Sequence, residues 1–176
     1  MSLFQSYPLF WPGVAFSALL GLLCGKPLAT RLGSNRLIAF LLVLSIGGIV
    51  SLTLLPNPAN DLVGIHPQWQ CVADRWTPGF TGEAGQNVLL FVPLGFTAAQ
   101  LPSRKAIAVV AAPFLVEGIQ FALPWLLRSC DSEDLVNNLT GLAVGFIVGL
   151  AIKLPLSRLI QRFRSRFLAS DDAPVR

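Results

Sequence analysis

Charged residues are scarce in this chain. Only 12% of its 176 residues are Asp, Glu, Lys or Arg, whereas a soluble domain usually carries about 25%. Hydrophobic residues make up 53% of the sequence, which argues against an ordinary soluble domain and indicates a membrane protein. The net charge of +4 does not indicate a nucleic-acid partner. The basic residues stand in short blocks between apolar runs, a pattern that favours topology signals and contacts with lipid headgroups.

The residues that usually hold metals and cofactors are also few. The chain has one histidine, His66, and three cysteines, Cys24, Cys71 and Cys130, without CxxC spacing. It has no glycine-rich phosphate loop, and no motif supports a Ser-His-Asp arrangement. We therefore expect no metal site, no cofactor and no catalysis by one of the familiar constellations.

Apolar runs are what the sequence has in abundance. A transmembrane helix needs about 20 mostly apolar residues, and about 17 are tolerated. The third run is short, so we expect its helix to begin one turn earlier, within residues 81–86. The chain then predicts a single all-α domain over residues 1–176, a bundle of about five transmembrane helices at roughly 9–24, 37–55, 87–101, 106–127 and 135–152.

The basic residues are divided unequally between the two sets of connections. Eleven of the thirteen fall on the side that holds the C-terminus, and only Arg75 and Arg128 fall on the other. The excess of Lys and Arg marks the cytoplasmic side of a membrane protein. This predicts an N-terminus outside the cytoplasm and a C-terminus inside it.

The C-terminal segment, residues 153–176, is basic and amphipathic. In LSRLIQRFRSRFL the apolar residues recur at helical spacing and arginines occupy the other positions. Such a segment is typical of an interfacial helix on an anionic leaflet. It can act as an ordinary topology anchor or as a lipid sensor.

Polar side chains interrupt three of the apolar runs. A charged acid at the bilayer centre costs roughly 2.5–3.5 kcal/mol, so Glu117 should be neutral, paired or turned toward a polar interior. Gln120 and Arg128 share its helical face. Asp134 and Asn138, with Asn137 beside them, lie on one face of the last run, and Asn87 begins the third run one turn after Glu83. These residues predict a polar cleft toward the outer half of the membrane, or else amides and one acid that hold the helices together.

Two further patterns concern packing. Gly141, Gly145 and Gly149 form overlapping GxxxG steps, which permit close helix approach within the chain or between chains. Cys71 and Cys130 fall in the two outer connections, where an oxidising exterior allows either a disulfide or two free thiols. Cys24, on the inner side, is interpreted as a small apolar filler.

Three blocks carry a resemblance to a known family. They are NVLLFVPLGF at residues 87–96, EGIQ at 117–120 and NNLTGLAVG at 137–145, in this order and spacing. The chain resembles the VanZ-like family of small bacterial membrane proteins over roughly residues 37–152. The resemblance implies the bacterial cytoplasmic membrane, and polar positions at Asn87, Glu117, Gln120, Arg128, Asp131, Asp134 and Asn138.

The resemblance also implies a role in the cell envelope, because the founding member is associated with resistance to teicoplanin. This sequence departs from the family pattern by inserting Ser129-Cys130 before Asp131, and Asn138 stands where Thr often follows the first Asn. Its outer loop is also longer.

Three functions remain open at the level of the sequence. The first is a non-enzymatic factor in the lipid bilayer that binds a lipid-linked or lipophilic molecule in the cleft. The second is a membrane enzyme that uses Glu117 or Asp134 for proton transfer. The third is a transporter subunit or assembly scaffold, for which the glycine stripe would be the contact face.

Overall fold

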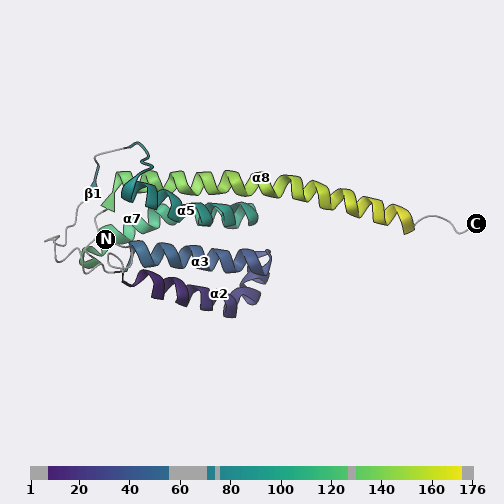
Figure 1. Ribbon diagram of the computed structural model, residues 1–176, viewed down its shortest axis with the longest axis horizontal. Coiled ribbons are helices and arrows are strands. Elements are labelled where there is room, and N and C mark those ends of the chain that lie inside the picture. The colour runs from purple at the N-terminus through teal and green to yellow at the C-terminus, as the bar shows by residue number, and fades with distance from the viewer. Residues whose placement is uncertain (1–7, 56–70, 74–75, 127–129, 172–176) are drawn as a thin grey trace, which may run out of the picture.

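The described residues form a bundle of helices with a short two-stranded pairing at its loop end. The computed structural model describes residues 8–55, 71–73, 76–126 and 130–171, with residues 124 and 155–171 described by their backbone alone. Figure 1 shows the helices side by side along one axis. The elements are α2 (Phe10–Leu32), α3 (Arg36–Thr53), β1 (Cys71–Val72), α5 (Gly82–Gln100), α6 (Ser103–Val110), α7 (Ala112–Ala122), η1 (Pro124–Leu126), β2 (Cys130–Asp131) and α8 (Ser132–Asp171).

The all-α membrane architecture predicted from the sequence is confirmed. Within the described residues, four stretches are long and apolar enough to cross a membrane, namely Phe10–Leu32, Arg36–Thr53, Ser103–Ala122 and Ser132–Leu154. The first helix continues past Cys24 to Leu32 and ends where Gly33 adopts a left-handed φ of 65°. Glycine accepts this conformation without steric cost, which makes it the usual residue after a helix end.

The fourth span is not the single helix over 106–127 that the sequence predicts. It is divided into α6 and α7 at Ala111, and α7 ends at Ala122. Pro113 explains the division, because proline has no N–H to donate to the carbonyl four residues earlier and its ring clashes with that turn. Pro124 explains the end, since the residue before a proline is disfavoured in the helical conformation.

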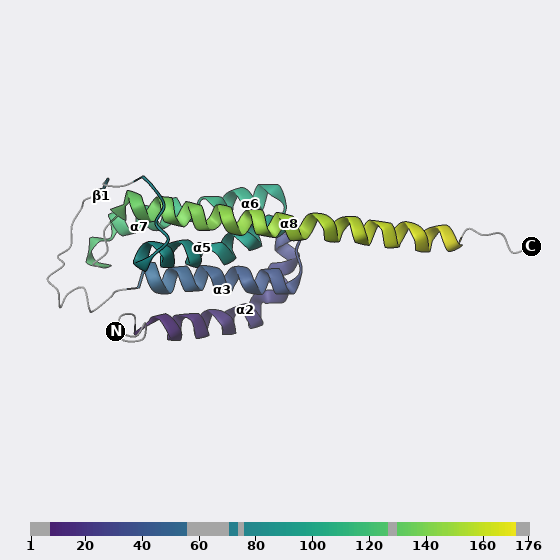
Figure 2. The same cartoon turned by 45° about the horizontal axis from the view of Figure 1, so that its top comes forward.

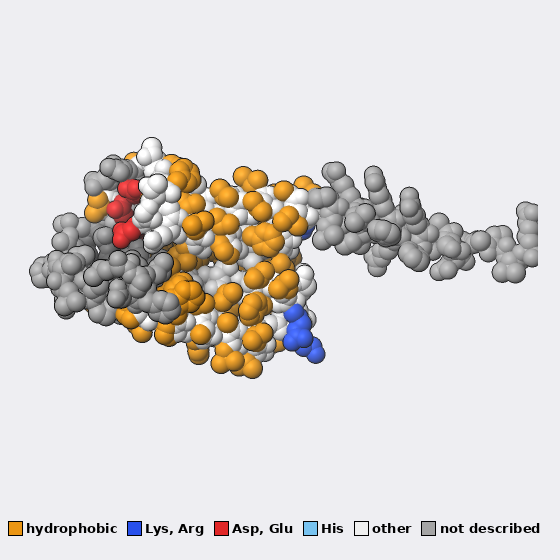
Figure 3. All heavy atoms as spheres, viewed as in Figure 1, with side chains coloured by type: hydrophobic (Ala, Val, Ile, Leu, Met, Phe, Trp, Pro, Cys, Tyr) orange, Lys and Arg blue, Asp and Glu red, His pale blue; other side chains and the backbone are white. Residues whose placement is uncertain are grey.

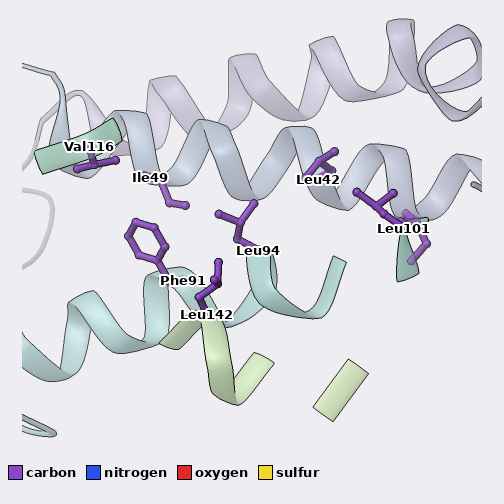
Figure 4. Packing of buried hydrophobic residues seen from close by; sticks show 8 residues of the cluster. Leu42, Ile49, Phe91, Leu94, Leu101, Val116 and Leu142 are labelled. Carbon is purple, nitrogen blue, oxygen red and sulfur yellow. The ribbon is translucent and has the colours of Figure 1, made fainter. Parts of the chain in front are cut away.

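The remaining long helix of the described residues, α5, is not among the four stretches that are long and apolar enough to cross a membrane. It lies between α3 and α8 (Figure 2). Its Phe91 and Ala98 are fully buried, and Leu94 nearly so. Figure 4 shows Phe91 and Leu94 directed toward Ile49 of α3, with Leu142 of α8 beside them. Neighbouring helices bury one side of α5 from Val88 onward, whereas Glu83 and Gln86 in its polar first turns are exposed.

The glycine stripe of α8 lies against α5. A Cβ added at Gly141 would come within 2.0 Å of the carbonyl oxygen of Val88, and one at Gly145 within 1.9 Å of that of Val92. Gly149 repeats the contact one turn further, 2.8 Å from the carbonyl oxygen of Phe96. The two backbones therefore touch along a parallel pair of helices. The sequence left open whether these glycines pack against a helix of the same chain or of another chain. In the structure they pack against α5 of the same chain.

The two ends of the bundle differ in charge. Figure 3 shows a broad apolar belt between acidic side chains at the loop end and basic side chains at the opposite end. At the basic end, Lys153 Nζ donates to the carbonyl oxygen of Ala99 at 2.8 Å, and Lys105 Nζ donates to that of Arg31. Basic side chains thus bind the otherwise unpaired carbonyls at helix C-termini.

The C-terminal segment is helical, and it continues α8 without a break to Asp171 (Figure 1). The backbone helix agrees with the amphipathic pattern of the sequence. The contact of this segment with a lipid surface stays a prediction.

Replacing Gly145 by Ala should destabilise the protein, because the new Cβ would collide with the carbonyl oxygen of Val92. Overpacking of this kind costs about 1–3 kcal/mol. Gly118→Ala is the matched control, since a Cβ at Gly118 meets nothing within 4 Å and alanine favours a helix. Thermal unfolding in mild detergent should show a clear loss for Gly145→Ala alone. Equal melting temperatures would show that the two helices separate easily.

The orientation in the membrane can be tested with a reporter that is active only outside the cytoplasm. We expect activity when it is inserted after Gly64, and none after Arg104 or Arg176, because the basic connections should stay inside. Activity at the C-terminus would reverse the topology.

Candidate functional site

A polar cavity of about 80 Å³ lies toward the acidic end of the bundle. It is formed by residues of α3, α5, α7 and α8, which come from distant parts of the chain. Five of the residues predicted from the sequence line it, namely Asn87, Glu117, Gln120, Asp134 and Asn138. The others are Leu52, Thr53, Glu83, Gln86 and Val116.

Glu117 is the buried acid of α7, with 6% of its surface exposed. Its Oε2 accepts a hydrogen bond from the backbone N–H of Asp131 at 3.1 Å, and its Oε1 accepts one from Asn138 Nδ2 at 3.4 Å. The side chain therefore turns away from lipid and joins α7 to the start of α8, as the cost of an intramembrane acid requires.

Gln120 follows one turn later on the same face. Its Nε2 donates to the backbone carbonyl of Thr53 at 3.0 Å, which ties α7 to the end of α3. Only 5% of Gln120 is exposed. Among the buried polar atoms of the described residues, Gln120 Oε1, Asn138 Oδ1 and Asn137 Nδ2 have no hydrogen-bond partner.

The third wall joins α5 to α8. Asn87 Nδ2 donates to Asp134 Oδ1 at 2.5 Å. Glu83 lies in the first turn of α5, and Asp134 lies in the first turn of α8. Carboxylates at these positions also complement the positive ends of the two helix dipoles.

The connection before α8 fixes the rim. Cys71 and Cys130 form a disulfide with a Cα–Cα distance of 4.5 Å, inside the parallel pair β1–β2. The next residue, Asp131, presents its N–H to Glu117, while its Oδ1 accepts from the N–H of Glu133 at 2.8 Å. Asp131 thus contributes its backbone to Glu117 and caps α8 with its side chain. Its side chain does not line the cavity.

Three further residues noted in the sequence do not line the described cavity. Arg128, expected at the rim, and His66 lie outside the described residues. Asn137 is fully buried, but it serves the loop, because its Oδ1 accepts a hydrogen bond from the N–H of Gly79 at 2.8 Å.

Some members of the site escaped the sequence analysis. Gln86 stands directly before Asn87, so its polarity at a helix start was the available signal. Thr53 contributes a carbonyl oxygen, and a backbone group leaves no mark in a sequence. Leu52 and Val116 are ordinary apolar residues that only packing brings to the cavity.

An apolar groove of about 350 Å³ adjoins the polar cavity. It runs between α3 and the α6–α7 pair, and Val116 belongs to both linings. Its other residues are apolar, among them Ile46, Ala108, Leu115 and Ile119. A second apolar groove, of about 450 Å³ between α2 and α3, shares no lining residue with the cavity.

The cavity is rich in acceptors. Its lining includes three carboxylates and four side-chain amides, and none of its described residues is Lys or Arg. The described residues hold no group of three or more His, Cys, Asp or Glu side chains close enough for a metal ion. The arrangement can therefore accept hydrogen bonds from a donor-rich polar group.

Glu117→Leu should destabilise the protein, because the N–H of Asp131 and the amide of Asn138 would lose their acceptor. A buried donor left unpaired costs about 1–3 kcal/mol. Glu117→Gln keeps one of the two acceptor oxygens and nearly the same volume, so it should lose less stability than the leucine variant. The check is the melting temperature of both variants in detergent. A leucine variant as stable as the glutamine variant would show that the hydrogen bonds of Glu117 to Asp131 and Asn138 do not stabilise the protein.

Comparison with known families agrees with the resemblance found in the sequence. The pattern of the family described as VanZ/LLP1 matches residues 37–153, which is most of the chain and spans α3 to the middle of α8. Comparison with curated proteins and with solved structures gives no match. The matched segment contains every described side chain of the polar cavity. The chain therefore belongs to the VanZ/LLP1 family.

Proposed function

We propose that this protein is a cell-envelope factor of the bacterial cytoplasmic membrane that binds a lipid-linked or lipophilic amphiphile. The polar part of the ligand occupies the cavity at Glu117, and its hydrocarbon part lies in the groove between α3 and α6–α7. The observation that carries the proposal is that Val116 lines both spaces, so they lie next to each other. An amphiphile likewise has a polar part next to an apolar part.

The position of the two spaces supports this arrangement. The cavity lies toward the acidic end, which the distribution of basic residues predicts to face outward. The groove opens to the side, since Leu115 is 61% exposed and Ala108 is exposed as well. A hydrocarbon chain could therefore stay in the apolar layer while its head reaches the polar residues.

The side-chain contacts support a binding role beside a structural one. Three contacts join the segments around the cavity. The Asn87–Asp134 hydrogen bond joins α5 to α8, and the Gln120–Thr53 hydrogen bond joins α7 to the end of α3. Glu117 joins α7 to Asp131, directly before α8. Asn138 and Gln120 nevertheless keep acceptor oxygens without a partner among the described residues. A purely structural network would leave fewer such atoms, because buried polar groups are nearly always paired.

An enzyme that acts on an envelope lipid is the second candidate. It is favoured by the presence of Glu117 and Asp134 in the same cavity, where either carboxyl group could transfer a proton to or from a bound substrate. The scaffold alternative loses its main support, since the glycine stripe is covered by α5. A link of this protein to teicoplanin resistance is proposed only because the chain belongs to this family.

Filling the groove should weaken binding of the ligand. Ala108→Trp places a large side chain in the groove at an exposed position, so the fold should tolerate it. Ile107→Trp is the matched control, because Ile107 is 71% exposed and does not line the groove. Each protein is reconstituted in vesicles of phosphatidylethanolamine, phosphatidylglycerol and cardiolipin, and bound lipid is counted by native mass spectrometry. We expect Ala108→Trp to retain at least ten times less lipid. Equal retention in both variants would contradict the groove.

A further inference from the structure

We propose that the polar head of the bound amphiphile carries a primary ammonium group, an inference that rests on the binding role proposed above. The carboxylates of Glu83, Glu117 and Asp134 line one small cavity, and no described lining residue is basic. Opposite charges attract more strongly in a partly buried, low-dielectric site than in water. Among the described residues, these three carboxylates therefore favour a cation over an anionic headgroup.

Two unpartnered oxygens give an independent indication. Asn138 is 2% exposed and Gln120 is 5% exposed, and both line the cavity. Gln120 Nε2 donates to a backbone carbonyl, and Asn138 Nδ2 donates to a carboxylate. Exchanging the oxygen and nitrogen of either amide would set two acceptors against each other, so the assignment is fixed by the partners.

Gln120 Oε1 and Asn138 Oδ1 are consequently hydrogen-bond acceptors without a donor among the described residues. A primary ammonium group supplies three N–H donors and a positive charge from a single compact atom. Hydrogen bonds that involve a charged donor are roughly twice as strong as neutral ones. The same group can thus satisfy the amide oxygens and the carboxylates together.

The helix dipoles explain only some of the carboxylates in the cavity. Glu83 and Asp134 stand in the first turns of α5 and α8, where a carboxylate stabilises the helix end. Glu117 is the middle residue of α7, past its first turn, so the helix dipole gives little reason for an acid there. Glu117 accepts hydrogen bonds from Asp131 and Asn138, and a cationic ligand would be a further partner for its charge.

The size of the cavity sets what can enter. Its volume of about 80 Å³ is several times the roughly 10–15 Å³ that a water-sized group needs by the same measure. An ammonium group on a short linker fits this space, and a phosphate that follows it would remain at the rim.

The test compares three single-chain phospholipids with the same acyl chain. Lysophosphatidylethanolamine carries three N–H donors, lysophosphatidylcholine has the same charge without N–H, and lysophosphatidylglycerol carries hydroxyl groups and a net negative charge. Each is titrated onto the purified full-length protein in neutral detergent, and bound lipid is measured by native mass spectrometry. We expect the ethanolamine lipid to bind at least tenfold more tightly than either of the other two.

Glu-to-Gln variants inside and outside the cavity test whether the preference for the ethanolamine lipid arises in the cavity. Glu83→Gln removes one carboxylate at an exposed lining position, so its fold should be unaffected. It should reduce the preference for the ethanolamine lipid at least threefold, and Glu83→Gln with Glu117→Gln should nearly abolish it. Glu133→Gln is the control, because Glu133 lies close by in α8 but does not line the cavity. It should keep the full preference.

The outcomes separate this inference from the proposed function. Equal binding of all three lipids, lowered for all of them by Ala108→Trp, would keep the binding role and overturn the ammonium head. Absence of binding by any lipid would overturn the proposed function and the inference with it. Free ethanolamine that competes as well as the lipid would assign the site to a soluble amine, and the ammonium chemistry would stand without the lipid.

Discussion

The close approach of α5 and α8 is the contact on which the rest of the structure depends. Each glycine of the stripe faces a carbonyl oxygen of α5, and no Cβ would fit in its place. Because the two helices run parallel and touch, their first turns stand side by side at the acidic end. This brings Asn87 within 2.5 Å of Asp134. The polar cavity exists because small residues let two backbones meet.

A second constraint follows from the surroundings of the helices. Lipid offers no hydrogen-bond partner, so polar groups in a membrane span must find partners inside the protein. Glu117, Gln120 and Asn137 each pair at least one polar atom with a backbone group of another segment. The contacts also close the loop end of the bundle, since two of the partners belong to the connections before α5 and α8. Here the disulfide between Cys71 and Cys130 adds a covalent tie next to Asp131.

The same demand separates what is structural in the site from what is available to a ligand. Asn87 and Gln120 each have one amide hydrogen bond that joins two helices. The oxygens of Gln120 and Asn138 are left over once those bonds are made. Val116 lines both this acceptor-rich space and an apolar groove, and the two together define the amphiphilic ligand we propose.

The sequence alone determined the membrane class, the helical architecture and five of the residues that line the polar cavity, because length, apolarity and helical spacing act locally along the chain. It also indicated the family, since the blocks at 87–96, 117–120 and 137–145 keep their order and spacing. It missed the break at Ala111, although Pro113 stood in the run. Only the tertiary structure decided that the glycine stripe packs within the chain, that the carbonyl of Thr53 binds Gln120, and that two amide oxygens stay unpaired. These facts depend on which helices become neighbours and at what distance, and backbone groups that meet across helices carry no signature in the side-chain sequence.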